Sequence, residues 1–361
     1  MVGVVTLSYA DLVAGKDLTN EIYEAYGPDG LGALTVSDIP TYDALRDQLL
    51  SRTYTLAHLP EEILSKYENS TSLYNVGWSR GKEKMGDKPD FAKGSYYANP
   101  VLDQPGSDTD RLNYPSACSA NIWPSEADAP GFEEAFKALG KLQYEVCLLV
   151  AMQVDALMQK RLPQYPDSHL HTLLDQAKRV KGRALHYYPL SEADGESEDS
   201  WIGWHNDSGF LTTLTAAQFY DEATGDKIEN PDPEGGLYAV NRQGDRVRVK
   251  IPVDHLAIQC GECLQVLTGG VLVATPHCVR GSRAPASNPG LKIGRTTFPC
   301  FVDAGIHAAL AAPPGVSRED VLAGAVQSKV PPLADRWTGN EQTFAEFLEA
   351  TFKQYYTWHT A

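Results

Sequence analysis

The segment "WHNDSGFLTTL", residues 204–214, joins a polar start to a run of β-branched and aliphatic residues. The second half is typical of a buried strand. Side chains alternate along a strand, so His205 and Asp207 would face the same side. A carboxylate held beside a buried strand needs a partner. A metal ion is one candidate, and solvent around the tip of a surface hairpin is the other.

Short runs of this β type fill residues 183–303 and are separated by turn residues. Many short strands of that spacing are typical of an antiparallel sandwich or jelly roll. Long amphipathic helical patterns precede and follow them, at 132–157 and 344–355. The sequence therefore predicts a mainly β protein with flanking helices (α+β), built on a double-stranded β-helix, or jelly-roll, core.

We divide the chain into four segments that are expected to form one folded unit. Residues 1–127 form an N-terminal mixed α/β region, and 128–182 supply long helices that support the core. Residues 183–303 form the catalytic β core, and 304–361 form a C-terminal helical segment. No internal repeat is visible.

The amino-acid composition is that of a globular protein and argues against some classes of partner. The 361 residues include 42% hydrophobic and 22% charged residues, as in ordinary globular proteins, and the net charge is −16. This charge disfavours nucleic acid as a partner. We see no targeting signal and no apolar run that would span a membrane, and six cysteines in so long a chain fit a reducing compartment. We therefore expect a cytoplasmic protein, a monomer, that acts on a small molecule.

A third metal ligand is available late in the same β region. His277 ends the strand-like run "VLVATPHCV" (271–279). An early and a late strand of a jelly roll can lie side by side, which would bring His277 to His205 and Asp207. Two histidines and one carboxylate on one face leave coordination positions open and suit non-haem Fe(II) that works with O2.

Several motifs in order resemble the Fe(II)/2-oxoglutarate-dependent dioxygenases of the isopenicillin N synthase-like, plant-type branch. The resemblance covers nearly the whole chain and is best over 183–303. It implies the β core described above, iron held by His205, Asp207 and His277, 2-oxoglutarate as cosubstrate, and ascorbate as a possible stimulant. The motifs that carry it are "ALHYYPL" (184–190), "HND" (205–207), "EGGLYAVNRQGDRVRVKIP" (234–252), "LAIQCGECLQVLTGGVLVATPHCV" (256–279), "GRTTF" (294–298) and the N-terminal "VVTLSYADL … EIYEAYGPDGLGALTVSDIP" (4–40).

The resemblance also implies a binding site for the distal carboxylate of 2-oxoglutarate. Arg295 and Thr297 stand where the family has Arg-x-Ser, and Tyr188, the second tyrosine of "YYP", would donate a third hydrogen bond. Two residues apart on a strand, the guanidinium and the hydroxyl share a face, and charge-assisted donors suit a buried carboxylate. Arg280-Gly281-Ser282 also spells Arg-x-Ser, but its offset from His277 would face it away.

The sequence departs from the family pattern around these motifs. His186 stands at the usual asparagine. The hydrophilic stretch 220–235 reads as an insertion between Asp207 and His277, and 281–290 as an extra loop between His277 and Arg295. The pair Cys260 and Cys263 could bind zinc, but both cysteines fall within predicted strands, where buried small apolar residues are expected.

Substrate residues are sought outside the β core, since iron and cosubstrate would occupy its interior. The loop 93–100 and the aromatic C-terminal helix are the two candidates, and their rings could equally be core residues. The residues concerned are Tyr96, Tyr97, Asn99, Phe347 and Phe352.

Three classes of function remain. The first is a 2-oxoglutarate-dependent dioxygenase that oxidises, most simply hydroxylates, a small organic substrate and releases succinate and CO2. The second is an Fe(II) oxidase of the same fold that does not use 2-oxoglutarate. The third is a non-enzymatic metal-binding jelly-roll protein, which the intact ligand set His205, Asp207 and His277 disfavours.

Overall fold

The computed structural model describes residues 3–82, 84–85, 88–190, 201–324 and 329–358. Its largest element is an 11-stranded sheet, in which β1 and β2 pair in parallel and the other strands pair antiparallel. Along the sheet the order is β1 (Val5–Ser8), β2 (Ala33–Ser37), β14 (Leu256–Cys260), β9 (Leu211–Thr215), β17 (Pro299–Asp303), β7 (Arg179–Tyr187), β16 (Ile293–Thr297), β10 (Gln218–Asp221) and β11 (Lys227–Ile228), with β6 (Lys93–Ala98) on β7 and β3 (Gly77–Arg80) on β6.

A second sheet of four antiparallel strands completes the jelly roll, and β4 (Lys84–Met85) and β5 (Lys88–Pro89) form a separate hairpin. Residues of both sheets meet in one apolar cluster, called here the barrel interior. This cluster consists of Leu185, Tyr187, Trp201, Phe219, Leu237, Ala239, Val249, Val279 and Ile293. The four strands are β13 (Arg246–Arg248), β12 (Gly236–Val240), β15 (His277–Arg280) and β8 (Ile202–His205).

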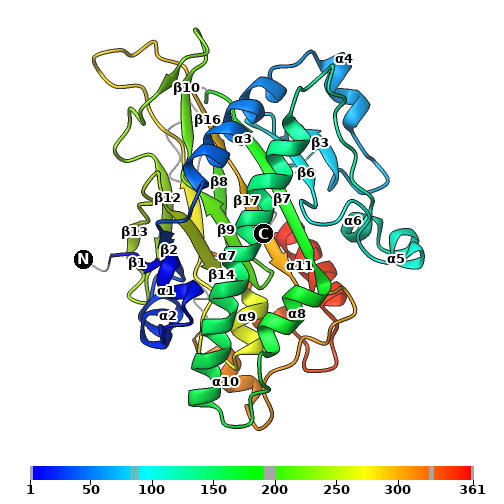
Figure 1. The fold of residues 1–361 in the computed structure, drawn as a ribbon, viewed down its shortest axis with the longest axis vertical. Coiled ribbons are helices and arrows are strands. Elements are labelled where there is room, and N and C mark those ends of the chain that lie inside the picture. Colours follow the sequence, from blue (N-terminus) through cyan, green and yellow to red (C-terminus); the bar gives the residue numbers. More distant parts are fainter. Residues whose placement is uncertain (1–2, 83, 86–87, 191–200, 325–328, 359–361) are drawn as a thin grey trace.

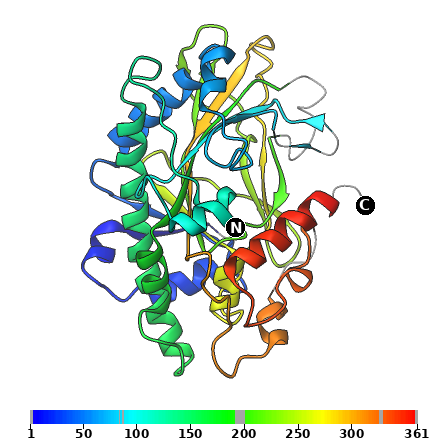
Figure 2. The same ribbon diagram turned by 90° about the vertical axis from the view of Figure 1, so that its right-hand side faces the viewer.

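Helices cover the outer face of the large sheet. The long helix α7 crosses this face (Figure 1), and its apolar stripe belongs to a second, larger core. Figure 2 shows α7 in green and α11 in red on opposite sides of the strands. The helices are α1 (Tyr9–Val13), α2 (Thr19–Tyr26), α3 (Tyr42–Ala57), α4 (Glu61–Leu64), α5 (Asp108–Asn113), α6 (Pro115–Cys118), α7 (Phe132–Arg161), α8 (His169–Ala177), α9 (Glu262–Leu267), α10 (Arg318–Ala323) and α11 (Phe344–Trp358), with 3-10 turns at Ser65–Tyr67 and Leu333–Asp335.

The mainly β architecture with flanking helices confirms the fold class expected from the sequence. The N-terminal strands β2 and β6 pair with β14 and β7, so the N-terminal region extends the sheet of the core. Among the described residues, no helix is both long and apolar enough to span a bilayer.

One segment that the sequence predicts as a strand is a helix. The run "CLQVLTGG" has a β-type composition, but Glu262–Leu267 forms α9, which begins after the N-cap Gly261. Every residue of α9 is buried. A short run that is buried all round has no amphipathic period, so its pattern cannot separate helix from strand.

Candidate active site

The two sheets bring the three expected metal ligands together. His205 ends β8 and His277 begins β15, and the two are direct partners across these antiparallel strands. Asp207 follows in the loop after β8. Its Oδ1 lies 3.9 Å from His205 Nε2 and 3.8 Å from His277 Nε2. The register of two strands therefore builds a cluster whose members are 70 residues apart in sequence (277 − 207).

Backbone carbonyls orient both imidazoles. His205 Nδ1 donates to Gly203 O at 2.8 Å, and His277 Nδ1 donates to Thr275 O at 3.1 Å. This leaves each Nε2 with a lone pair directed at the cluster, the usual arrangement for a metal-ligating histidine. Burial, and then the adjacent His277 ring, lower the pKa of His205 to about 4. The ring is therefore neutral at neutral pH, as a ligand must be.

The carboxylate completes a donor set that fits Fe(II). Asp207 is buried, and its Oδ2 has no hydrogen-bond partner within the described residues. An orphaned buried carboxylate oxygen is costly in a folded protein. A divalent cation held by His205, Asp207 and His277 removes that cost, and two histidines with one carboxylate are the ligands that non-haem Fe(II) prefers. The residues present fit the metal.

A buried ion pair holds the ligand loop in place. Glu262 at the start of α9 and Arg336 lie 2.5 Å apart, and both are fully buried. Glu262 Oε1 also accepts from Asn206 Nδ2 at 2.9 Å, and Glu262 N donates to Asp207 O at 2.8 Å. Arg336 Nη1 donates to Thr351 Oγ1 at 3.2 Å, which ties the network to α11. Sequence reasoning missed this network, because its members are far apart in the chain.

Breaking this pair should destabilise the fold. We expect Glu262→Gln to lower the free energy of unfolding by about 3–5 kcal/mol, since Arg336 keeps a buried charge without its partner. Urea unfolding measures this. The exposed pair Lys353–Glu349 is the control, and Lys353→Met should cost less than about 1 kcal/mol. A small loss in Glu262→Gln, equal to that of the control, would contradict the role given to the pair.

Arg295 lies inside the barrel without an anionic partner. Only 5% of the Arg295 surface is exposed, and its Nε and Nη1 atoms have no hydrogen-bond partner in the described part of the chain. Its guanidinium lies 4.8 Å from the centre of the Tyr187 ring and 5.6 Å from that of Trp201. Burial lowers the pKa of Arg295 below its ordinary value. A guanidinium held in this way is a receptor for a carboxylate.

The structure corrects the expectation for Tyr188. Tyr187 is the direct partner of Arg295 across β7 and β16, and its ring belongs to the barrel interior. Tyr188 is one residue further along, and its hydroxyl donates to Ala57 O at 2.7 Å on the other side of the sheet. A shift of one residue on a strand reverses the face. Tyr187 therefore stands beside Arg295.

Thr297 lies two residues beyond Arg295 on β16 and is buried. Its hydroxyl donates to Thr215 O at 3.1 Å, so its single proton already has an acceptor. Arg280, in the second Arg-x-Ser sequence, lies 4.0 Å from Glu234, whose side chain is exposed. Of the two arginines, Arg295 is the one placed in the barrel interior.

Two of the proposed substrate residues are core residues. Tyr96 is fully buried and its hydroxyl donates to Ile122 O. Phe347 is fully buried against Arg336 on the inner face of α11. Phe352 lies on the same helix with 53% of its surface exposed. Helical spacing placed aromatic rings on α11, but only the packing shows which of them point inward.

Tyr97 and Asn99 lie near a charged strip of β7. Lys181 Nζ lies 4.5 Å from the centre of the Tyr97 ring, and the guanidinium carbon of Arg183 lies 5.2 Å from it. Asn99 lines a cavity of about 40 Å³ beside this strip, while its amide bonds Lys178 O at 3.0 Å and fixes the turn that follows β6. Asn99 is thus committed to the backbone, and Tyr97 remains a candidate.

Arg183 is a site residue that the sequence reading missed. Odd-numbered residues of β7 share one face, and Leu185 and Tyr187 on that face line the barrel interior. Burial and His277 lower the pKa of His205 most, and the charge of Arg183 adds a smaller contribution in the same direction. Counting back along the strand in steps of two residues from Tyr187 leads to Arg183.

The cysteines carry no metal site among the described residues. All six are free and buried, and burial raises the pKa of both Cys260 and Cys263. Cys263 Sγ donates to Ser208 O at 3.0 Å, beneath the ligand loop. This matches the expectation of small buried residues.

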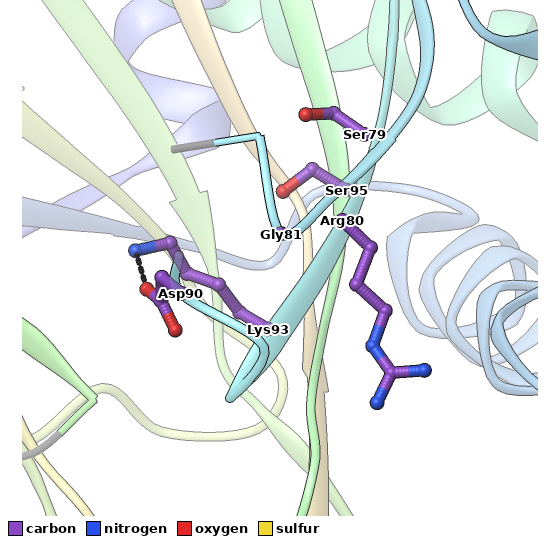
Figure 3. A pocket seen from close by; sticks show the side chains of 6 residues that line it. All are labelled: Ser79, Arg80, Gly81, Asp90, Lys93 and Ser95. Carbon is purple, nitrogen blue, oxygen red and sulfur yellow. Dashed lines mark hydrogen bonds and ion pairs between the residues drawn. The ribbon is translucent and has the colours of Figure 1, made fainter. Parts of the chain in front are cut away.

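A further cavity lies between β3 and β6 (Figure 3). Lys93 reaches the Asp90 carboxylate at 2.6 Å across it, and the Arg80 side chain points away from this pair. With about 10 Å³ it has room for about one water molecule. It is too small for a substrate.

No family model matches the chain. The 2-oxoglutarate-dependent dioxygenase frbJ of Dothideomycetidae sp. is 26% identical over 76% of this chain and 67% of the relative. A 2-oxoglutarate-dependent dioxygenase of Gibberella zeae is 26% identical over 69% of this chain and 60% of its own length, so the chain spans less than two thirds of that relative.

Solved structures share the fold over nearly the whole chain. A 2OG-Fe(II) oxygenase family protein from Caulobacter crescentus has a TM-score of 0.68, at 19% identity over 98% of this chain and 99% of that one. A full-length Neurospora crassa protein, crystallised with α-ketoglutarate and 5-formyluracil, also has a TM-score of 0.68, at 16% identity over 96% of this chain and 94% of that one.

The chain is similar in sequence to curated 2-oxoglutarate-dependent dioxygenases and shares the fold of a 2OG-Fe(II) oxygenase family protein. The described residues also contain the group His205, Asp207 and His277, whose ligand atoms could hold a metal ion. The curated relatives are named for 2-oxoglutarate, which is a dicarboxylate.

Proposed function

We propose that the protein is an Fe(II)- and 2-oxoglutarate-dependent dioxygenase that oxidises a small organic substrate and releases succinate and CO2. The main support for this proposal is that one barrel contains both a cluster of metal-ligating residues and a buried arginine, each without a partner of opposite charge. Within the described residues, the triad lacks a cation for Asp207 Oδ2, and Arg295 lacks an anion for Nε and Nη1. A metal ion and a dicarboxylate would complete both.

Bound Fe(II) would supply the redox chemistry with O2. His205 and His277 contribute neutral nitrogen donors with fixed ring orientation, and Asp207 contributes negative charge. Arg295 would bind the distal carboxylate of 2-oxoglutarate, and the Tyr187 hydroxyl beside it would help to orient that group. The apolar walls of the barrel interior, such as Leu185 and Trp201, exclude water from this ion pair and so strengthen it.

A cosubstrate assay tests the proposal directly. The purified protein, supplied with Fe(II), ascorbate and O2, should convert 2-oxoglutarate to succinate at a slow uncoupled rate even without its substrate. Succinate is measured by mass spectrometry. Absence of succinate, with iron bound at one per chain, would favour the oxidase that does not use 2-oxoglutarate.

The two neighbouring tyrosines form a matched pair of variants. Tyr187→Phe should raise the KM for 2-oxoglutarate about 3- to 10-fold, because one net hydrogen bond is worth about 0.5–1.5 kcal/mol. Tyr188→Phe should leave this KM unchanged, since its hydroxyl bonds Ala57 O. Steady-state succinate formation measures both. Equal KM values in the two variants would remove Tyr187 from the cosubstrate site.

The substrate is expected at the Tyr97 and Arg183 side of β7. Tyr97→Leu should lower product formation per succinate by roughly threefold or more while iron binding is kept, because a ring on this face would position the substrate. Phe352→Ala is the control, as this ring is half exposed on α11. Substrate turnover and succinate are counted together once a substrate is found. Tight coupling in Tyr97→Leu would place the pocket elsewhere.

We further propose that the protein works as a monomer in the cytoplasm on a small molecule. The acidic net charge of −16 and the deep, apolar cosubstrate site support a small organic substrate over a nucleic acid. Light scattering on the purified chain tests the oligomeric state.

A further inference from the structure

A second group of metal-binding side chains lies on the opposite face of β7 from Arg295. It consists of His58, which follows the last residue of α3, His186 on β7, and Glu222, which follows β10. One nitrogen or oxygen of each residue lies within 4.8 Å of the others. Nothing in the dioxygenase chemistry above uses these three residues.

His58 has the orientation of a metal ligand. Its Nδ1 donates to Tyr54 O at 2.7 Å, and its Nε2 lies 2.7 Å from Glu222 Oε2. The backbone bond fixes the ring and directs Nε2 into the group, as the carbonyl bonds do for the iron ligands. The His58 side chain is 35% exposed, so water can reach this side of the group.

His186 is the observation that an ordinary ion pair does not explain. It is fully buried, and neither ring nitrogen has a hydrogen-bond partner among the described residues. Its Nε2 is 3.2 Å from Glu222 Oε1, yet the two are not aligned for a hydrogen bond, and this oxygen also has no hydrogen-bond partner in the same part of the chain. Buried polar atoms without a hydrogen-bond partner are rare in folded proteins, and a cation shared by these atoms would satisfy them.

A glycine on the neighbouring strand makes room for the Glu222 carboxylate. Gly294 on β16 lies beneath it, and a Cβ atom at this position would come within 1.8 Å of Glu222 Oε1. The Tyr54 ring lies tilted beside the His58 ring with centres 4.2 Å apart, and Tyr188 meets His186 edge-on at 4.6 Å. These rings fix the two imidazoles from the sides.

Two departures from the family pattern meet in this group. His186 replaces the usual asparagine, and Glu222 lies in the stretch 220–235 that reads as an insertion.

We propose that His58, His186 and Glu222 form a second metal site that takes Zn²⁺, with solvent as the fourth ligand. Two imidazole nitrogens and a carboxylate oxygen are ligands that Zn²⁺ accepts in four-coordinate sites. The ion joins the end of α3 to β7 and to the segment after β10. Because β10 and β7 both pair with β16, the site braces the strand that carries Arg295 from behind.

Measuring the number of metal ions bound per chain tests the proposed zinc site. The full-length protein is loaded anaerobically with one Fe(II) per chain, given one equivalent of ZnCl2, desalted and measured by mass spectrometry of the elements. One iron and one zinc per chain are expected. His58→Ala and Glu222→Gln should each lose the zinc and keep the iron, with zinc affinity reduced at least about 100-fold. Asp207→Ala should lose the iron and keep the zinc.

His307→Ala is the matched control. His307 Nε2 lies 2.7 Å from Asp110 Oδ1, the same spacing as in the His58–Glu222 pair, but no second histidine among the described residues joins it. This variant should keep both metals. Circular dichroism of His58→Ala, which changes an exposed helix end, checks that its fold is intact. No zinc in the wild-type protein, or unchanged zinc in a folded His58→Ala, would overturn the proposal and leave a simple histidine–carboxylate pair.

Discussion

An Asp207→Ala variant should lose iron from its ligand triad and all succinate formation. Asp207 is the single anionic member of the triad. Loss of a residue that only hydrogen-bonds to a ligand lowers metal affinity by roughly 10- to 100-fold, and loss of a charged ligand itself should lower it further. Iron per chain and succinate release measure the two effects. His277→Ala should behave in the same way, because it removes a nitrogen donor from the same face.

Unfolding measurements on the metal-free protein show whether the Asp207 carboxylate is a metal ligand or stabilises the fold itself. In the metal-free protein Asp207 is buried and its Oδ2 has no partner within the described residues, so Asp207→Ala should unfold at the same urea concentration as the metal-free wild type or a higher one. Asp303→Ala is the contrast. Its carboxylate pairs with Arg179 at 3.0 Å and accepts from Phe210 N at 3.2 Å, so its loss should destabilise the fold. Full iron and turnover in Asp207→Ala would refute the triad.

Arg295→Met should raise the KM for 2-oxoglutarate by at least about 30-fold. A buried carboxylate that loses its charged partner loses about 2–5 kcal/mol of binding free energy, and about 1.4 kcal/mol corresponds to a factor of ten. The fold itself should tolerate the change. Methionine is apolar and of similar length, and the guanidinium that it replaces has Nε and Nη1 unpaired among the described residues of the barrel.

Arg280→Met is the control for charge removal at an Arg-x-Ser sequence. Arg280 lies opposite the exposed Glu234, so its loss should leave the KM for 2-oxoglutarate unchanged. Succinate formation over a range of 2-oxoglutarate concentrations measures both variants. If Arg295→Met keeps the wild-type KM, the buried guanidinium serves a substrate carboxylate, and the oxidase that does not use 2-oxoglutarate becomes the better description.

The sequence by itself determined the fold class and pointed to three residues, His205, Asp207 and His277, that the structure brings together. The His-x-Asp spacing pointed to His205 and Asp207, although Asp207 lies in the loop after β8, and His277 was chosen from its place in a late strand and from the family resemblance. The choice of Arg295 over Arg280 also follows from local pattern, since only Arg295 opens a new β run. The fold class depends on short-range periodicity, which a sequence displays directly, whereas the roles of the triad and of Arg295 were implied by the family resemblance.

Tertiary structure alone decided which residues of the same type face the site. Tyr187 and Tyr188 are adjacent, and the pairing of β7 with β16 determines which of them meets Arg295. Tyr96 and Phe347 became core residues for a similar reason, because aromatic rings suit a pocket and a core equally well and burial depends on the partner element.

The Glu262–Arg336 pair and the group of His58, His186 and Glu222 have no local signature at all. Their members come from separate elements, up to 164 residues apart (222 − 58), and only the folding of the chain brings them together. A sequence records the period of each strand and helix. The register between strands and the packing between layers arise from long-range contacts, and these decided the rest of the site.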